Sequence, residues 1–233
     1  MQNLYVAWHL KHIFQKENMT NSIKYLLFIA FISFSNAEEK PIKINITGNV
    51  LDGFDINVYK KMSPPSNNSL TTLKELKEIN GMRNDAKFVK DKDNIRSAFK
   101  KVAQKNGLPY PKDLVEGLIT DSAPSILKLK KHFGRPRPKH LAPSFGMELK
   151  DIEMDSMKTP SYPSGHSVQG ILIGKALGKL YPKHRADFEK EGKDISMSRR
   201  VGRAHFKSDS DLGEKIGTDM FNHVKDKLNG KIK

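Results

Sequence analysis

The chain has 233 residues, with 37% hydrophobic and 29% charged residues, which suits one globular domain with a substantial core or at most two small ones. It contains no cysteine, and this excludes disulfides, thiolate zinc sites and cysteine nucleophiles. The formal net charge of +15 is compatible with nucleic acid, an anionic membrane surface or a small anionic substrate, and equally with a solvated lysine-rich surface.

Residues 1–37 have the pattern of a secretory signal peptide. Lys24 precedes the apolar run "YLLFIAFISF" at 25–34, and "SNA" at 35–37 offers small residues for signal peptidase. Met19 is an alternative start, with residues 1–18 as an upstream extension. The run is too short for a spanning helix, although an N-terminal membrane anchor is the alternative. We expect a periplasmic or secreted protein without stable membrane insertion after signal cleavage.

The chain after the signal is predicted to consist of an irregular segment at 38–68 and a helical domain at 69–233. The sequence "MSPPSNNS" at 62–69 is typical of a loop. Beyond it, apolar residues recur at helical spacing. They predict one helix over 70–81, one or two over 88–107 and one over 111–133. The polar stretch from "GRPRP" at 134–138 to about residue 162 predicts no regular element.

Three further helices are expected over 164–180, 194–206 and 211–228. The first carries Gly170, Gly174 and Gly178 at intervals of four residues. Because each glycine costs up to about 1 kcal/mol of helix propensity, we expect this face to admit a closely packed neighbour. No segment shows the alternation of a strand, and no internal repeat is visible. These patterns predict an all-α, single-domain fold.

Residues able to carry chemistry concentrate in three segments, "KKHFGRPRP", "PSGH" and "SRRVGRAHFKSD". Each alone has an ordinary explanation, because basic side chains are usually solvated and a lone histidine is more often structural than catalytic. Their occurrence together, in order, favours one shared site. The residues concerned are Lys130, Arg137, Pro138, Pro163, Ser164, Gly165, His166, Ser198, Arg199, His205 and Asp209.

The residue types in these segments suit a phosphate group. Lys130, Arg137 and Arg199 supply three cations for a dianion, and a guanidinium fork matches two oxygens at once. If a helix starts at 164, the amides of Ser164 and Gly165 lie among its unsatisfied N–H groups and would face an anion. The histidine and carboxylate spacing has no zinc-site pattern, so no metal is expected.

The three segments match the patterns Lys-x6-Arg-Pro, Pro-Ser-Gly-His and Ser-Arg-x5-His-x3-Asp. The chain therefore resembles the phosphatidic acid phosphatase type 2 superfamily, which includes bacterial class A non-specific acid phosphatases, membrane lipid phosphatases and vanadium haloperoxidases. Its size and expected export make it most similar to the class A acid phosphatases. The resemblance implies an all-α helical bundle of the acid phosphatase/vanadium haloperoxidase type over about residues 70–228.

The resemblance further implies a phosphoric monoester hydrolase, an exported and metal-independent acid phosphatase that forms a phosphohistidine on His205. Asp209 would orient His205, while His166 would protonate the leaving alkoxide and later activate water. No cofactor is implied. The expected partners are small phosphorylated substrates rather than nucleic acid, and a homo-oligomer is left open. The phosphate-binding residues would be Lys130, Arg137, Ser164, Gly165 and Arg199.

Three alternatives remain open at the level of sequence. A lipid phosphate or prenyl diphosphate phosphatase at a membrane surface would use the same residues, although such relatives usually hold the site in a membrane-embedded bundle. A vanadium haloperoxidase would bind vanadate in the same pocket, but those relatives are generally much longer. A basic protein binding nucleic acid or an anionic surface would need a stacking platform, and only 8% of the residues are aromatic.

Overall fold

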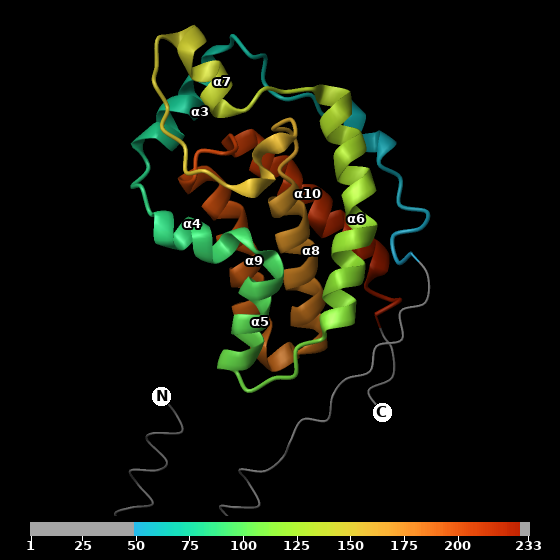
Figure 1. Ribbon diagram of the computed structural model, residues 1–233. Helices are drawn as coiled ribbons and strands as arrows, with labels where there is room; N and C mark the ends of the chain where they lie inside the picture. The colour runs from blue at the N-terminus through green and yellow to red at the C-terminus, as the bar shows by residue number, and fades with distance from the viewer. Residues whose placement is uncertain (1–48, 229–233) are drawn as a thin grey trace, which may run out of the picture. The chain divides into compact units, whose positions relative to one another are not determined.

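The computed structural model describes residues 49–228, which form helices and connecting loops without a β-strand (Figure 1). The predicted all-α fold is therefore confirmed, whereas the signal peptide predicted for 1–37 lies outside the described residues. The helices, with η marking 3-10 turns, are η1 (Asn57–Lys61), α3 (Leu70–Gly81), α4 (Ala86–Asp93), α5 (Ile95–Lys105), α6 (Lys112–Phe133), α7 (Pro138–Leu141), η2 (Ala142–Phe145), η3 (Asp155–Lys158), α8 (Gly165–Leu180), η4 (Pro182–His184), α9 (Arg185–Val201) and α10 (Lys207–Val224).

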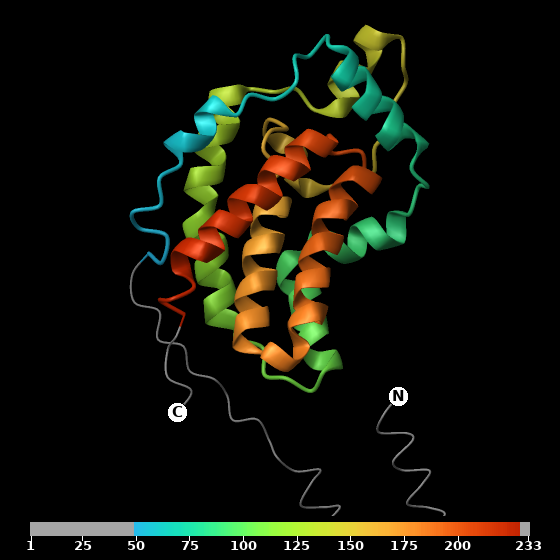
Figure 2. The ribbon, with the colours of Figure 1, turned by 180° about the vertical axis from the view of Figure 1, so that it is seen from behind.

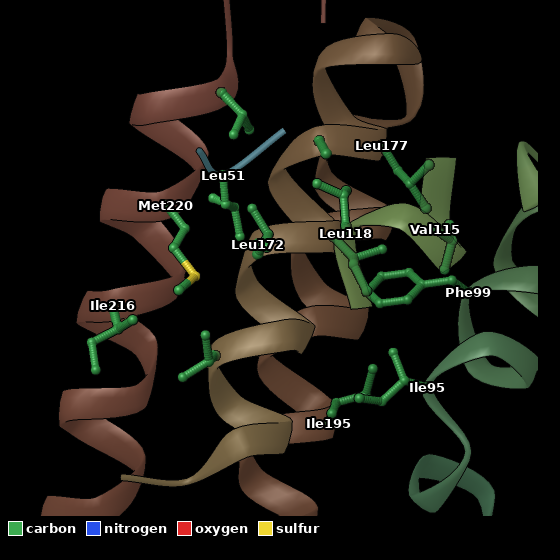
Figure 3. Packing of buried hydrophobic residues seen from close by; sticks show 14 of the residues in the cluster. Leu51, Ile95, Phe99, Val115, Leu118, Leu172, Leu177, Ile195, Ile216 and Met220 are labelled. Carbon is green, nitrogen blue, oxygen red and sulfur yellow. The ribbon is translucent and has the colours of Figure 1, made fainter. Parts of the chain in front are cut away.

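Helix α8 is the central element, and it packs most extensively against α9 and α10, which lie on either side of it in Figure 2. It is apolar around most of its circumference, as expected of a helix with neighbours on several sides. Its residues Leu172 and Leu177 join Phe99, Leu118 and Ile216 in the main core (Figure 3). None of the helices described is both long enough and apolar enough to cross a membrane.

The expected close-packing glycine face of α8 is confirmed. A Cβ atom added at Gly170 would lie 2.9 Å from the carbonyl oxygen of Gly192, and one at Gly174 would lie 2.7 Å from that of Phe188, both in α9. The partner helix α10 uses glycine in the same way on the other side, because a Cβ at Gly217 would lie 2.4 Å from the carbonyl oxygen of Val168. Backbone contacts on both sides therefore fix α8, whose first turn carries part of the site.

Gly217→Ala is expected to destabilise the fold by about 1–3 kcal/mol, because the backbone of α8 must shift to admit the methyl group. Gly117→Ala is the matched control in α6, where a Cβ would meet nothing within 4 Å, and it should stabilise by about 0.5–1 kcal/mol through helix propensity. Urea unfolding followed by circular dichroism measures both. Equal midpoints for the two variants would contradict the close-packing interpretation.

Two predicted helix boundaries are wrong near the motifs. Helix α9 covers Arg185–Val201 instead of 194–206, because its buried residues Phe188 and Ile195 are separated by charged residues that hide the periodicity. It ends early because Arg203 adopts a left-handed conformation (φ 57°). Helix α10 starts at Lys207 rather than at 211. His205 therefore lies in the short connection between α9 and α10 and not on the helix that carries Arg199.

The segments expected to be irregular contain short helical turns. The stretch 134–162 includes α7, η2 and η3, joined by loops. Before α3, the turn η1 places Tyr59 in the main core together with Val50 and Leu51. The Tyr59 hydroxyl donates to Asp219 Oδ2 in α10 at 2.7 Å. This N-terminal stretch is thus held against the C-terminal helix.

Candidate active site

The structure brings all the predicted site residues together at one end of α8. They come from the end of α6, the loop after it, the first turn of α8, the end of α9 and the start of α10. The two histidines, His166 and His205, are each tied to a cation of the same site. Arg137 contacts His205 directly, and Asp93 contacts both Arg199 and His166.

His205 has one ring nitrogen held and the other turned toward a cation. Its Nδ1 lies 3.2 Å from Asp209 Oδ2, and because a carboxylate oxygen only accepts, Nδ1 carries the proton. Its Nε2 then has the lone pair and lies 3.3 Å from Arg137 Nη1, which donates to it. Burial, only partly offset by the hydrogen bond to Asp209, lowers the pKa of His205 to about 3. The ring is therefore neutral, and its lone pair on Nε2 faces Arg137.

Asp209 is buried and accepts hydrogen bonds on both carboxylate oxygens. Oδ2 accepts from the Phe206 amide at 2.9 Å and from the Ser161 hydroxyl, in addition to His205 Nδ1. Oδ1 accepts from Arg135 Nη1 at 2.7 Å. Burial alone would raise the pKa of Asp209, but the hydrogen bond from His205, the charge of Arg135 and the hydrogen bond from Ser161 hold it below the ordinary value. The carboxylate is thus ionised and fixed in orientation.

The predicted phosphate-binding cations Lys130 and Arg137 are buried and covered by backbone carbonyls of residues 156–161, in η3 and the segment after it. Lys130 Nζ donates to the carbonyl oxygens of Pro160 at 2.5 Å and Ser161 at 3.4 Å. Arg137 donates through Nε to Thr159 and through Nη2 to Ser156, at 2.9 and 3.2 Å. Carbonyl oxygens are weaker partners for a cation than phosphate oxygens, so an incoming phosphate can replace them.

The third predicted cation, Arg199, is 1% exposed. Its Nη1 donates to Asp93 Oδ1 at 2.7 Å, and Nη2 contacts the Met154 sulfur. Its buried Nε has no hydrogen-bond partner among the described residues. A buried guanidinium with an unpaired donor leaves a hydrogen bond for a ligand oxygen to satisfy.

The first turn of α8 provides amides for an anion, but not the pair that was predicted. The Ser164 amide donates to the Asp209 carbonyl oxygen at 2.9 Å, so the expectation that it is unsatisfied is wrong. Ser164 is the N-cap, and its hydroxyl accepts from the Ser167 amide and hydroxyl at 3.3 and 2.9 Å, which leaves its own proton to donate. The amides of Gly165 and His166, the first two positions of the helix, have no intrahelical acceptor and can bind an anion.

His166 is held by the backbone of α4. Its Nε2 donates to the Asp93 carbonyl oxygen at 2.9 Å, so the neutral ring has its lone pair on Nδ1. Burial, followed by the charge of Arg199, lowers the pKa of His166 to about 3. Because neighbouring positive charge disfavours the imidazolium, a bound dianion would favour it. Nδ1 is therefore the atom that can give or take a proton when an anion occupies the site.

Sequence analysis missed four residues that complete this arrangement. Arg135 lies inside the first motif segment and Ser161 just before the second, so their proximity along the chain was a usable signal. Asp93 at the end of α4 and Glu75 in α3 reach the site from more distant segments. No motif in the sequence points to those two carboxylates.

Comparison with known proteins agrees with the motifs. No protein-family model matches the chain. It is 33% and 32% identical, over 92 residues, to the non-specific acid phosphatases of Salmonella typhimurium and Salmonella typhi, and 31% identical over 106 residues to an acid phosphatase of Zymomonas mobilis. The chain resembles the bacterial non-specific acid phosphatases. The matches cover 40% of this chain and 36% of each Salmonella enzyme, and 46% of this chain and 40% of the Zymomonas enzyme.

Proposed function

We propose that the protein is an exported acid phosphatase that hydrolyses phosphate monoesters through a phosphohistidine on His205 and needs no metal. The observation that carries the proposal is the pairing around His205. Its Nδ1 is held by Asp209 at 3.2 Å, while its lone pair on Nε2 lies 3.3 Å from Arg137 Nη1. A neutral nucleophile beside a buried cation is the arrangement that attack on an anionic phosphorus requires.

Substrate binding would replace the internal contacts of the cations with contacts to phosphate. The equatorial oxygens would be bound by Lys130, Arg137 and Arg199, together with the amides of Gly165 and His166. Three cations oppose the charge that spreads over these oxygens in the transition state. Among residues 49–228 no group of three histidine, aspartate or glutamate side chains could hold a metal ion. In this proposal the side-chain cations of Lys130, Arg137 and Arg199 stabilise the charge of the transition state.

The reaction would proceed in two displacements. The lone pair on His205 Nε2 attacks phosphorus, the ester P–O bond breaks, and the leaving alkoxide takes the proton from Nδ1 of protonated His166. Water then attacks the phosphohistidine and passes a proton to His166 Nδ1, while the P–N bond breaks and returns neutral His205. Throughout both steps Asp209 holds the proton-bearing Nδ1 of His205.

Hydrolysis of p-nitrophenyl phosphate by the purified protein in EDTA tests the function. We expect turnover between about pH 4 and 8 with optimum activity on the acid side, because the nucleophile is neutral and the cations are charged there. Folded protein without turnover would contradict the proposal. Comparing sugar phosphates and nucleotides with phosphatidic acid and a prenyl diphosphate would separate a broad monoesterase from a lipid phosphatase.

The charge of Lys130 is expected to set the alkaline limb of the pH profile. Burial, reinforced by the nearby charge of Arg137, lowers the pKa of Lys130 to about 7. As the pH rises through this value in the free enzyme, Lys130 loses its proton and its attraction for the substrate, so kcat/KM falls. Lys130→Arg keeps the charge and should move this limb up by about one pH unit or more. Exposed Lys131→Arg is the control, and an unmoved limb in Lys130→Arg would contradict the assignment.

Export is the part of the proposal that depends on residues 1–37. The test is to express the full chain in a Gram-negative host, to fractionate the cells and to determine the N-terminal residue of the recovered protein. We expect the protein outside the cytoplasm, starting at Glu38. Intact protein confined to the cytoplasm would contradict export without affecting the proposed chemistry.

A further inference from the structure

A buried pair of charged side chains lies behind Asp209, on the side away from His205. Arg135 is 1% exposed, and its Nη1 donates to Asp209 Oδ1 and to Ser208 Oγ, both at 2.7 Å. Its Nη2 donates to Glu75 Oε2 at 3.3 Å. Glu75 is 7% exposed and accepts from the Ser208 amide at 2.6 Å and the Ser208 hydroxyl at 2.9 Å. Helix α3 is thereby joined to the first turn of α10.

We propose that Arg135 and Glu75 are positioning residues for phosphoryl transfer. They hold the Asp209 carboxylate so that its Oδ2 accepts the hydrogen bond from His205 Nδ1. The inference rests on the proposed function, because it assigns these residues a part in the reaction of His205. Neither residue belongs to the three motif patterns, and neither contacts His205 itself. They act on the nucleophile only through Asp209.

The geometry supports a positioning role because the two oxygens of Asp209 are divided between different partners. Arg135 engages Oδ1, whereas Oδ2 receives His205 together with the Phe206 amide and the Ser161 hydroxyl. Rotation of the carboxylate that moved Oδ2 away from His205 would also break the hydrogen bond between Arg135 and Oδ1. The guanidinium of Arg135 is itself held, since its central carbon lies 4.0 Å from the ring centroid of Phe206, the residue that follows His205.

The charges support the same role. If Arg135 paired with Asp209 alone, the guanidinium would neutralise most of the charge of the carboxylate. Because Glu75 shares the guanidinium from its other side, the group of two carboxylates and one cation keeps a net negative charge beside His205. That charge stabilises the positive charge that forms on the imidazole when Nε2 bonds to phosphorus. Glu75 thus strengthens Asp209 as a partner of the nucleophile.

Glu75→Gln tests the proposal because the amide keeps the size of the side chain and can still accept from Ser208. We expect kcat for p-nitrophenyl phosphate to fall about 10- to 100-fold, by analogy with the loss of the hydrogen-bond partners that orient metal-ligating histidines. The inhibition constant of inorganic phosphate should stay within about threefold, because phosphate contacts other residues. The matched control is Glu78→Gln, one turn further along α3, where the carboxylate pairs with Arg200 of α9. Both constants should remain within about twofold there.

Ser208→Ala is the second variant, because it removes the hydroxyl that links Arg135 to Glu75 while changing little volume, and it decides the question if Glu75→Gln does not fold. We expect a smaller loss of kcat in the same direction with phosphate inhibition unchanged. An unchanged kcat, a parallel loss of kcat and phosphate affinity, or an equal loss in Glu78→Gln would overturn the proposal.

Turnover by the wild-type protein separates this proposal from the proposed function. If the wild type is inactive, the proposed function fails, and nitrogen-15 NMR of histidine-labelled protein still tests the positioning. The wild type should show His205 protonated on Nδ1 alone, and Glu75→Gln should shift the ring resonances. Identical His205 resonances in the two proteins would contradict a positioning role regardless of activity.

Discussion

Replacement of His205 by alanine is expected to abolish phosphoenzyme formation and to lower kcat by about 10⁴-fold or more, as the loss of a covalent nucleophile does in other enzymes. The reason is that its Nε2 carries the lone pair of the ring and lies 3.3 Å from Arg137 Nη1, a cation that would bind the phosphate. The other histidine of the site, His166, has its Nε2 engaged by the Asp93 carbonyl oxygen. No equivalent nucleophile remains at that place when the ring is removed.

The measurement is single-turnover mixing with phosphorus-32-labelled substrate, followed by denaturation and detection of an acid-labile, alkali-stable label. The wild type should carry label and His205→Ala should carry none. His140→Ala, at an exposed histidine after α6, is the control and should label as the wild type does. Inorganic phosphate should still bind to His205→Ala, because the cations and the α8 amides remain. Labelling of His205→Ala at the wild-type level would remove the nucleophile assignment.

The sequence was sufficient for the features that local patterns encode. Apolar spacing located α3, α6 and α8, and the glycine spacing of α8 indicated a closely packed neighbour. The candidate site residues could be named because each motif holds several of them within a short segment. Lys130, for example, lies in the last turn of α6, and Arg137 follows after the short loop to α7. Both side chains therefore reach the same site.

The features that the sequence did not show depend on backbone conformation or on contacts between distant segments. Arg203 adopts the left-handed conformation that ends α9 before His205, and an arginine in that conformation carries no recognisable sequence signal. The Ser164 amide is occupied by the carbonyl oxygen of Asp209, which α10 brings against α8. Glu75 and Asp93 reach the site from separate helices, and pairings of this kind cannot be inferred from one sequence.

His166→Ala is expected to separate the two chemical steps. Toward an alkyl phosphate, kcat/KM should fall about 10²- to 10⁴-fold, because the alkoxide leaves without a proton donor. Toward p-nitrophenyl phosphate the first step should be affected far less, since nitrophenolate is stable without protonation. The second step still needs His166 Nδ1 to activate water. The variant should therefore release nitrophenol in a burst close to one equivalent per site and then accumulate phosphoenzyme.

Stopped-flow absorbance with p-nitrophenyl phosphate and steady-state hydrolysis of glycerol phosphate measure these two effects. Gln169→Ala is a matched control on the next turn of α8, where the side chain donates to Ile119 and Ser122 of α6 and not to the site. It should retain wild-type kinetics with both substrates. An equal loss of His166→Ala toward both substrates, without a burst, would mean that the ring serves phosphate binding rather than proton transfer. The dependence on the leaving group thus tests whether Nδ1 of His166 transfers the proton. This role is expected because Nε2 already donates to the Asp93 carbonyl oxygen.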